Sequence, residues 1–197
     1  MKRFLKLTLL VPVLIALLSA CGTGKETPSG QPSATMHPSV AEKMAEPKLV
    51  YKDDRFEMKL NIDKTDYKAG EPIVYSASLT YIGEEESFTV WGSSSAKVVF
   101  TLTDGKGFDM EGASTDDLVP MEMTRGEAME FPFVKSGGYG SEDPDAAFWK
   151  TFYSEKELLL PPGTYVISAI CNFSLSQEVV VDSRYDGEVH TTVTVSE

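Results

Sequence analysis

A strict alternation of apolar and polar residues recurs after residue 49, and it constrains the fold more than any other feature. It is clearest over Phe56 to Ile62, over 73–81 and over 165–175. Successive side chains of a strand point to opposite faces, so this period is typical of strands with one buried face. Turn residues separate about eight or nine such segments at roughly 8–12-residue intervals. We therefore predict an all-β chain that folds as an antiparallel β-sandwich over residues 49–197.

The first 20 residues are different. Lys2, Arg3 and Lys6 precede an apolar run from Leu7 to Leu18. A positive segment followed by a short apolar run is typical of a signal peptide, and a spanning helix needs about 20 apolar residues. We predict that residues 1–20 are a cleaved signal peptide.

The four residues Leu18, Ser19, Ala20 and Cys21 end this segment. They resemble the lipobox of bacterial lipoproteins. The resemblance implies transfer of a diacylglyceryl group to the Cys21 thiol and cleavage between Ala20 and Cys21. Two acyl chains hold a protein stably on a bilayer, whereas one holds it marginally. We expect a lipid-anchored protein on the extracytoplasmic face of a Gram-positive-like cell membrane; the alternative is an ordinary signal peptide with an incidental cysteine.

Residues 21–48 are predicted to be the lipidated cysteine and a flexible linker. This stretch is rich in Gly, Ser, Thr, Pro, Lys and Glu and has no hydrophobic period. His37 lies in it and is expected to be solvated.

The net charge of the protein excludes one class of binding partner. The formal net charge is -12, and loss of Lys2, Arg3 and Lys6 with the signal peptide would lower it to about -15. Such a surface repels phosphate groups, so we expect no nucleic-acid partner.

The chain has two cysteines, Cys21 and Cys171. If Cys21 carries lipid, Cys171 has no partner for an internal disulfide. Cys171 shares the apolar face of a predicted strand with Ile167 and Phe173, so we predict a buried core residue and not a nucleophile.

Catalytic patterns are lacking in the sequence. The two histidines are His37 and His190, and no Gly-x-Ser-x-Gly motif accompanies them. We place His190 on the exposed face of the last strand. Glu142, Asp143 and Asp145 could form a weak calcium site, but we expect a solvated turn there. The prediction is a protein that is not an enzyme and has no cofactor and no metal site.

Aromatic residues mark a candidate contact surface. Tyr139 lies in the Gly-rich stretch 134–147, and Phe148 and Trp149 follow it directly. Loops on a rigid β scaffold often carry function, so this group could contact a protein or a glycan. The alternative is packing at the end of the sandwich.

Two resemblances add to this picture. Pro162-Gly163-Thr164-Tyr165 resembles the tyrosine corner of immunoglobulin-like and fibronectin type III domains, which implies a bond from the Tyr165 hydroxyl to backbone upstream. The order Gly70-Glu71-Pro72-Ile73, Asp104-Gly105-Lys106-Gly107 and Arg125-Gly126-Glu127 is similar to immunoglobulin-like domains of Gram-positive lipoproteins, including the BsuPI family related to intracellular proteinase inhibitor. We expect a non-catalytic binding or accessory module for an envelope protein or extracellular ligand; the alternative is a BsuPI-like proteinase inhibitor, and an enzyme is less favoured.

Overall fold

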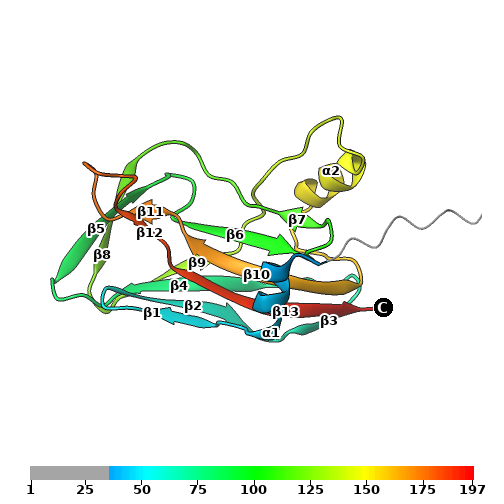
Figure 1. Cartoon of the computed structure of the whole chain (residues 1–197), viewed down its shortest axis with the longest axis horizontal. Coiled ribbons are helices and arrows are strands. Elements are labelled where there is room, and N and C mark those ends of the chain that lie inside the picture. The colour runs from blue at the N-terminus through cyan, green and yellow to red at the C-terminus, as the bar shows by residue number, and fades with distance from the viewer. Residues whose placement is uncertain (1–35) are drawn as a thin grey trace, which may run out of the picture. The chain divides into compact units, whose positions relative to one another are not determined.

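The computed structural model describes residues 36–197, in which 13 strands form three sheets and two short helices are added (Figure 1). The all-β sandwich predicted from the alternation is confirmed. The predicted signal peptide, the lipobox with Ala20 and Cys21, and linker residues 21–35 lie outside the described residues. In the described part of the chain, no helix is long and apolar enough to cross a membrane.

Two sheets face each other across the core. The first is antiparallel and has the order β1 (Val50–Lys52), β2 (Phe56–Ile62), β4 (Tyr75–Tyr81), β9 (Ala128–Pro132). The second has the order β3 (Asp66–Lys68), β13 (Glu188–Ser196), β10 (Gly163–Cys171), β6 (Val98–Thr103), β7 (Asp109–Met110). Its pairs are antiparallel except β3 with β13, which is parallel.

A third sheet continues the second at one end. Its order is β12 (Arg184–Tyr185), β11 (Phe173–Ser174), β5 (Ser87–Gly92), β8 (Val119–Thr124). Only Asn172 separates β10 from β11, and 186–187 separate β12 from β13. The chain stays bonded at the break, because Asn172 N donates to Lys97 O at 2.8 Å and Cys171 N donates to Gly187 O at 2.8 Å.

The core lies between the apolar faces that the alternation predicted. Phe56 and Met58 of β2 are fully buried, as is Ile167 of β10. Cys171 is 1% exposed, and its Sγ lies 3.6 Å from Met58 Sδ, so the predicted core cysteine is confirmed. Burial raises the pKa of the Cys171 thiol to about 12, which leaves almost no thiolate at neutral pH.

The start of β10 has the predicted tyrosine corner. Tyr165 is buried, and its hydroxyl donates to Pro161 O at 3.0 Å. This bond fixes the chain where it enters β10, as the resemblance implied.

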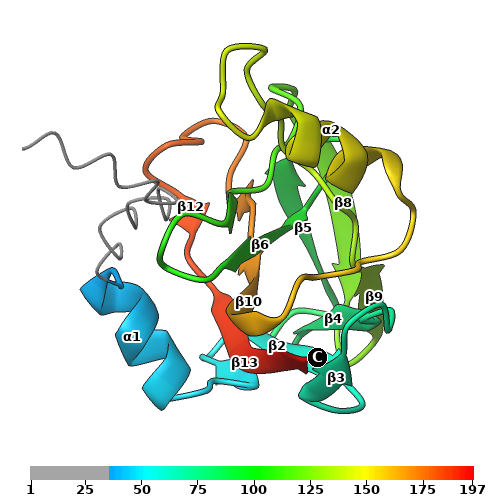
Figure 2. The same ribbon diagram turned by 90° about the vertical axis from the view of Figure 1, so that its right-hand side faces the viewer.

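Helix α1 (Pro38–Ala45) lies beside β13 (Figure 2). The sequence predicts flexible linker here, but the helix is held by an ion pair of Lys43 with Glu188 and by Thr192 Oγ1, which donates to Met44 O at 3.3 Å. Val40 also packs over Gly105. A helix of eight residues is marginal alone, so tertiary contacts account for it.

Two edge strands carry proline on their open sides. In an antiparallel pair, alternate residues point their backbone N–H groups toward the partner strand and away from it. Arg125 N donates to Glu86 O and Phe133 N donates to Tyr75 O, so the residues at even positions of β8 and β9 face away from the paired strand. Pro120 of β8 and Pro132 of β9 are at such positions. Proline has no N–H, so these edges resist pairing with another strand.

Candidate functional site

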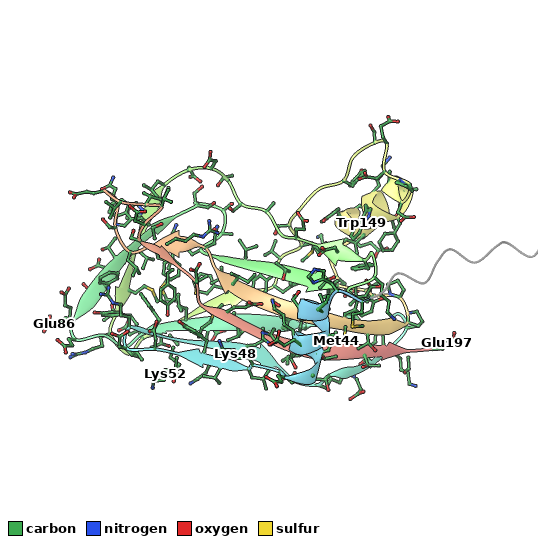
Figure 3. All side chains as sticks on the ribbon, in the orientation of Figure 1. Met44, Lys48, Lys52, Glu86, Trp149 and Glu197 are labelled. Carbon is green, nitrogen blue, oxygen red and sulfur yellow. The ribbon has the colours of Figure 1, made fainter. Side chains whose placement is uncertain are left out.

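Two of the predicted aromatic residues, Phe148 and Trp149, lie on helix α2 (Ala146–Ser154), and Tyr139 lies beside Tyr153 of the same helix; Trp149 is labelled in Figure 3. Trp149 is half-buried, and its ring centroid lies 5.0 Å from that of Phe108 and 5.4 Å from that of Phe152. Phe152 is 4% exposed beneath the helix. Trp149 therefore belongs mainly to the packing that attaches α2 to the sheets.

Tyr139 and Phe148 differ from Trp149 because they keep much of their surface in solvent. Tyr139 is 41% exposed and Phe148 is 38% exposed. The Tyr139 ring lies nearly parallel to that of Tyr153, 10° apart in plane, and the Phe148 ring meets that of Phe108 at 72°. The structure thus brings two of the three predicted contact residues to the surface, supported by aromatic rings below.

Lysine fixes the end of α2. Lys135 Nζ donates to Phe152 O at 2.7 Å and to Glu155 O at 3.0 Å, and it lies 4.4 Å from the Phe152 ring centroid. A cation at the carbonyl end of a helix is favourable. Burial lowers the pKa of the Lys135 ammonium, although Glu155 opposes this. Lys135 thus satisfies two backbone carbonyls at this end of the helix.

The acidic group before α2 forms a turn, as predicted. Asp143 Oδ2 accepts from Gly140 N at 2.5 Å, and Asp143 N donates to Gly140 O at 3.2 Å. Glu142 and Asp145 are exposed nearby. Among residues 36–197, no group of three or more His, Cys, Asp or Glu side chains is close enough to hold a metal ion.

The prediction that His190 lies on an exposed strand face is wrong. Its side chain is 11% exposed, because residues 46–48 after α1 cover it. His190 Nε2 lies 3.1 Å from Glu46 O, whereas Nδ1 has no hydrogen-bond partner among residues 36–197 and lies 3.9 Å from Glu188 Oε1. His190 therefore holds the α1 segment against β13, and solvent-borne substrates do not reach it.

A cavity of about 530 Å³ lies at the other end of the sandwich, on the third sheet. Register places Trp91 of β5, Ser174 of β11 and Arg184 of β12 directly across from one another. Side chains at paired positions lie on one face of a sheet. The inward face holds Val90 and Phe173, so this row lies on the outer face.

The loop before β8 forms one wall of this cavity. Thr115 Oγ1 donates to Asp117 Oδ1 at 2.5 Å, and Ser94 N donates to the same oxygen at 3.0 Å. Hydrogen bonds from Ser94 and Thr115 lower the pKa of Asp117 to about 2. Ser93 Oγ lies 2.7 Å from Thr115 Oγ1 and joins the two loops.

Buried Lys97 fixes the loop after β5. Its Nζ donates to Gly92 O at 3.1 Å and to Ser93 O at 2.7 Å. Burial lowers the pKa of the Lys97 ammonium, and Asp117 partly opposes this. Ser93 and Ser94 of this loop also bond to Thr115 and Asp117, so the floor of the cavity at Gly92 and Ser93 is joined to its wall.

One feature of the sequence points to this second site. Trp91 alternates with buried Val90, so an outward tryptophan was readable from the pattern. The pairing of Trp91 with Ser174 and Arg184 was not readable, because these residues lie more than 80 positions further along the chain.

Comparison with known proteins assigns no family to the chain. No protein-family model and no curated protein matches the chain. Among solved structures, the sporulation control protein Spo0M from Bacillus subtilis aligns with a TM-score of 0.36 and 11% identity, over 73% of this chain and 50% of that one. The aligned part is thus half of the length of that protein, and the likeness carries no argument about function.

Proposed function

We propose that this protein is a non-catalytic, lipid-anchored binding module of the bacterial envelope, which presents the α2 end to a partner protein or extracellular ligand. The observation that carries the proposal is the exposure of Tyr139 and Phe148, 41% and 38%, whose rings lie against those of Tyr153 and Phe108. Exposed aromatic residues with ordered support are typical of interaction surfaces. They supply apolar contact area at a low cost in side-chain entropy.

Two other features support this reading. The lipobox resemblance at Cys21 would hold the protein at the membrane, with residues 22–35 between the anchor and the described domain. The absence of a catalytic motif agrees with the position of His190, which is buried under residues 46–48. A binding role needs neither a cofactor nor a metal.

Site-specific photo-crosslinking in intact cells tests the contact surface. A photoreactive residue at Phe148 should give one discrete crosslinked product, and Tyr139→Ala should reduce its yield by about tenfold if the ring contributes about 1.4 kcal/mol. Val74, which is 76% exposed and lies just before β4, is the matched control position. Equal crosslinking from positions 74 and 148, or no effect of Tyr139→Ala, would contradict the proposal.

Membrane fractionation tests the anchor separately. Wild-type protein should partition with membranes, and Cys21→Ala should accumulate as precursor or appear in the medium, because two acyl chains are then missing. Membrane partition of Cys21→Ala equal to wild type would rule out the lipid anchor and leave the contact surface untouched.

A further inference from the structure

The outer face of the third sheet carries a cavity that the proposed function does not use. It lies above the row Trp91, Ser174 and Arg184, between the 114–118 loop and residues 180–181. Its volume of about 530 Å³ lies within the range of small-ligand sites, about 300–1,000 Å³. Figure 1 shows β5, β8, β11 and β12 at the end of the sandwich away from α2.

Several polar groups of this cavity are available to a ligand. Within residues 36–197, the side chains of Trp91, Arg184 and Asp116 take part in no hydrogen bond or ion pair. The indole N–H and the guanidinium are donors, and the carboxylate is an acceptor. In contrast, Asp117 is already bound to Ser94 and Thr115 and acts as part of the wall.

The mixture of charges argues against a simple ionic ligand. An anion drawn to Arg184 would meet Asp116 and Asp117, and a cation drawn to these carboxylates would meet Arg184. Leu118 and Val181 add apolar surface at the cavity, 38% and 85% exposed. The ligand that suits all of these groups is neutral, has both donors and acceptors, and has an apolar face.

A sugar ring has these properties. Its hydroxyl groups donate and accept hydrogen bonds around the rim, and its axial C–H groups form an apolar face that can lie on an aromatic ring. Trp91 is half-buried on the outer face, so it offers a ring with an apolar body and one N–H donor. The floor beneath is preorganised, because Lys97 Nζ holds Gly92 O and Ser93 O.

We propose that this cavity binds a neutral saccharide, with one sugar ring on Trp91 and its hydroxyl groups bonded to Arg184 and Asp116. The site is separate from Tyr139 and Phe148, so the protein would have a glycan site at one end and a contact surface at the other.

Titration followed by nuclear magnetic resonance of the two tryptophan indole N–H signals tests the site. The full-length chain is used in phosphocholine detergent, which has no sugar headgroup, with chitotriose and maltotriose as probes. At least one trisaccharide should move the Trp91 signal in a saturable way in the millimolar range, and the Trp149 signal should stay in place. Acyclic glucitol should have no effect, since it offers hydroxyl groups without a ring.

Variants define the contribution of each group. Trp91→Ala should weaken binding by at least about tenfold, and Trp91→Phe should retain part of the affinity because it keeps a ring. Arg184→Gln should weaken binding severalfold, whereas the matched control Lys150→Gln, exposed on α2, should not change it. Unchanged melting temperatures would show that each variant is folded.

Three results would overturn the proposal. The first is no saturable movement of the Trp91 signal with either trisaccharide. The second is tighter binding of acetate or of tetralysine than of both trisaccharides, which would assign an ionic ligand. The third is full retention of affinity in folded Trp91→Ala.

Discussion

The two tryptophans lie at opposite ends of the sandwich and serve different purposes. Trp149 packs among Phe108 and Phe152 and attaches α2, and nearby Lys135 satisfies the carbonyls at the end of that helix. Trp91 lies on the outer face of the third sheet and lines a cavity whose donors and acceptors are only partly used. The same residue type packs against aromatic rings at one end, whereas at the other it lies beside polar groups that the described part of the chain leaves unbonded.

The largest expected difference between the two ends is in stability. Phe152→Ala removes a ring that is 4% exposed under α2, and it should lower the free energy of unfolding by about 3–5 kcal/mol. Trp91→Ala should cost less, about 1–2 kcal/mol, because its ring is only partly buried. Urea denaturation followed by circular dichroism measures both. Equal losses would remove the distinction between the ends.

A smaller effect is expected at the floor of the Trp91 cavity. A Cβ on Gly92 would lie 2.6 Å from Asn172 O, beside the pairing of β11 with β5. Gly92→Ala should therefore lower the free energy of unfolding by about 1–3 kcal/mol, because it forces the two backbones apart. It should also disturb the Trp91 indole signal. Gly138→Ala is the control, since nothing lies within 4 Å of its Cβ position. If both substitutions have the same effect, the close approach at Gly92 is not what shapes the floor.

The smallest effect concerns the wall of the same cavity at low pH. The folded pKa of Asp117, about 2, lies below its ordinary 3.8 because Ser94 and Thr115 bond the ionised form. Its contribution to stability is therefore complete above pH 3.8 and is lost as the pH falls through about 2. The Ser94 amide shift should follow this midpoint. In Asp117→Asn that titration should vanish, and a wild-type midpoint near 3.8 would mean that the two bonds do not hold the carboxylate.

Much of the fold follows from local pattern. The alternation along 56–62, 73–81 and 165–175 located the inner strands and the buried face that includes Cys171. The reason is that all apolar residues of an alternating strand lie on one face, and only that face can be buried without burying the polar residues. The Pro-Gly-Thr-Tyr motif also located the bond of Tyr165 to Pro161. These features depend on neighbours in the sequence.

The predictions of a flexible linker at α1 and of an exposed His190 are wrong for the same reason. A helix of eight residues is too short to be stable in isolation, and an alternating strand shows only which face a histidine takes. The segment and the strand cover each other through Lys43 with Glu188 and through His190 with Glu46, contacts that span more than 140 positions. Local sequence patterns cannot predict that two segments so far apart in the chain bury each other.

The sequence by itself determined the inner strands, the core face and the candidate aromatic residues Tyr139, Phe148 and Trp149. Only the tertiary structure decided which of these three remain exposed, and only strand register brought Trp91, Ser174 and Arg184 together over one cavity. The physical reason is that side-chain direction is set by the backbone period of each strand, whereas exposure and neighbours are set by pairing between strands far apart in the chain.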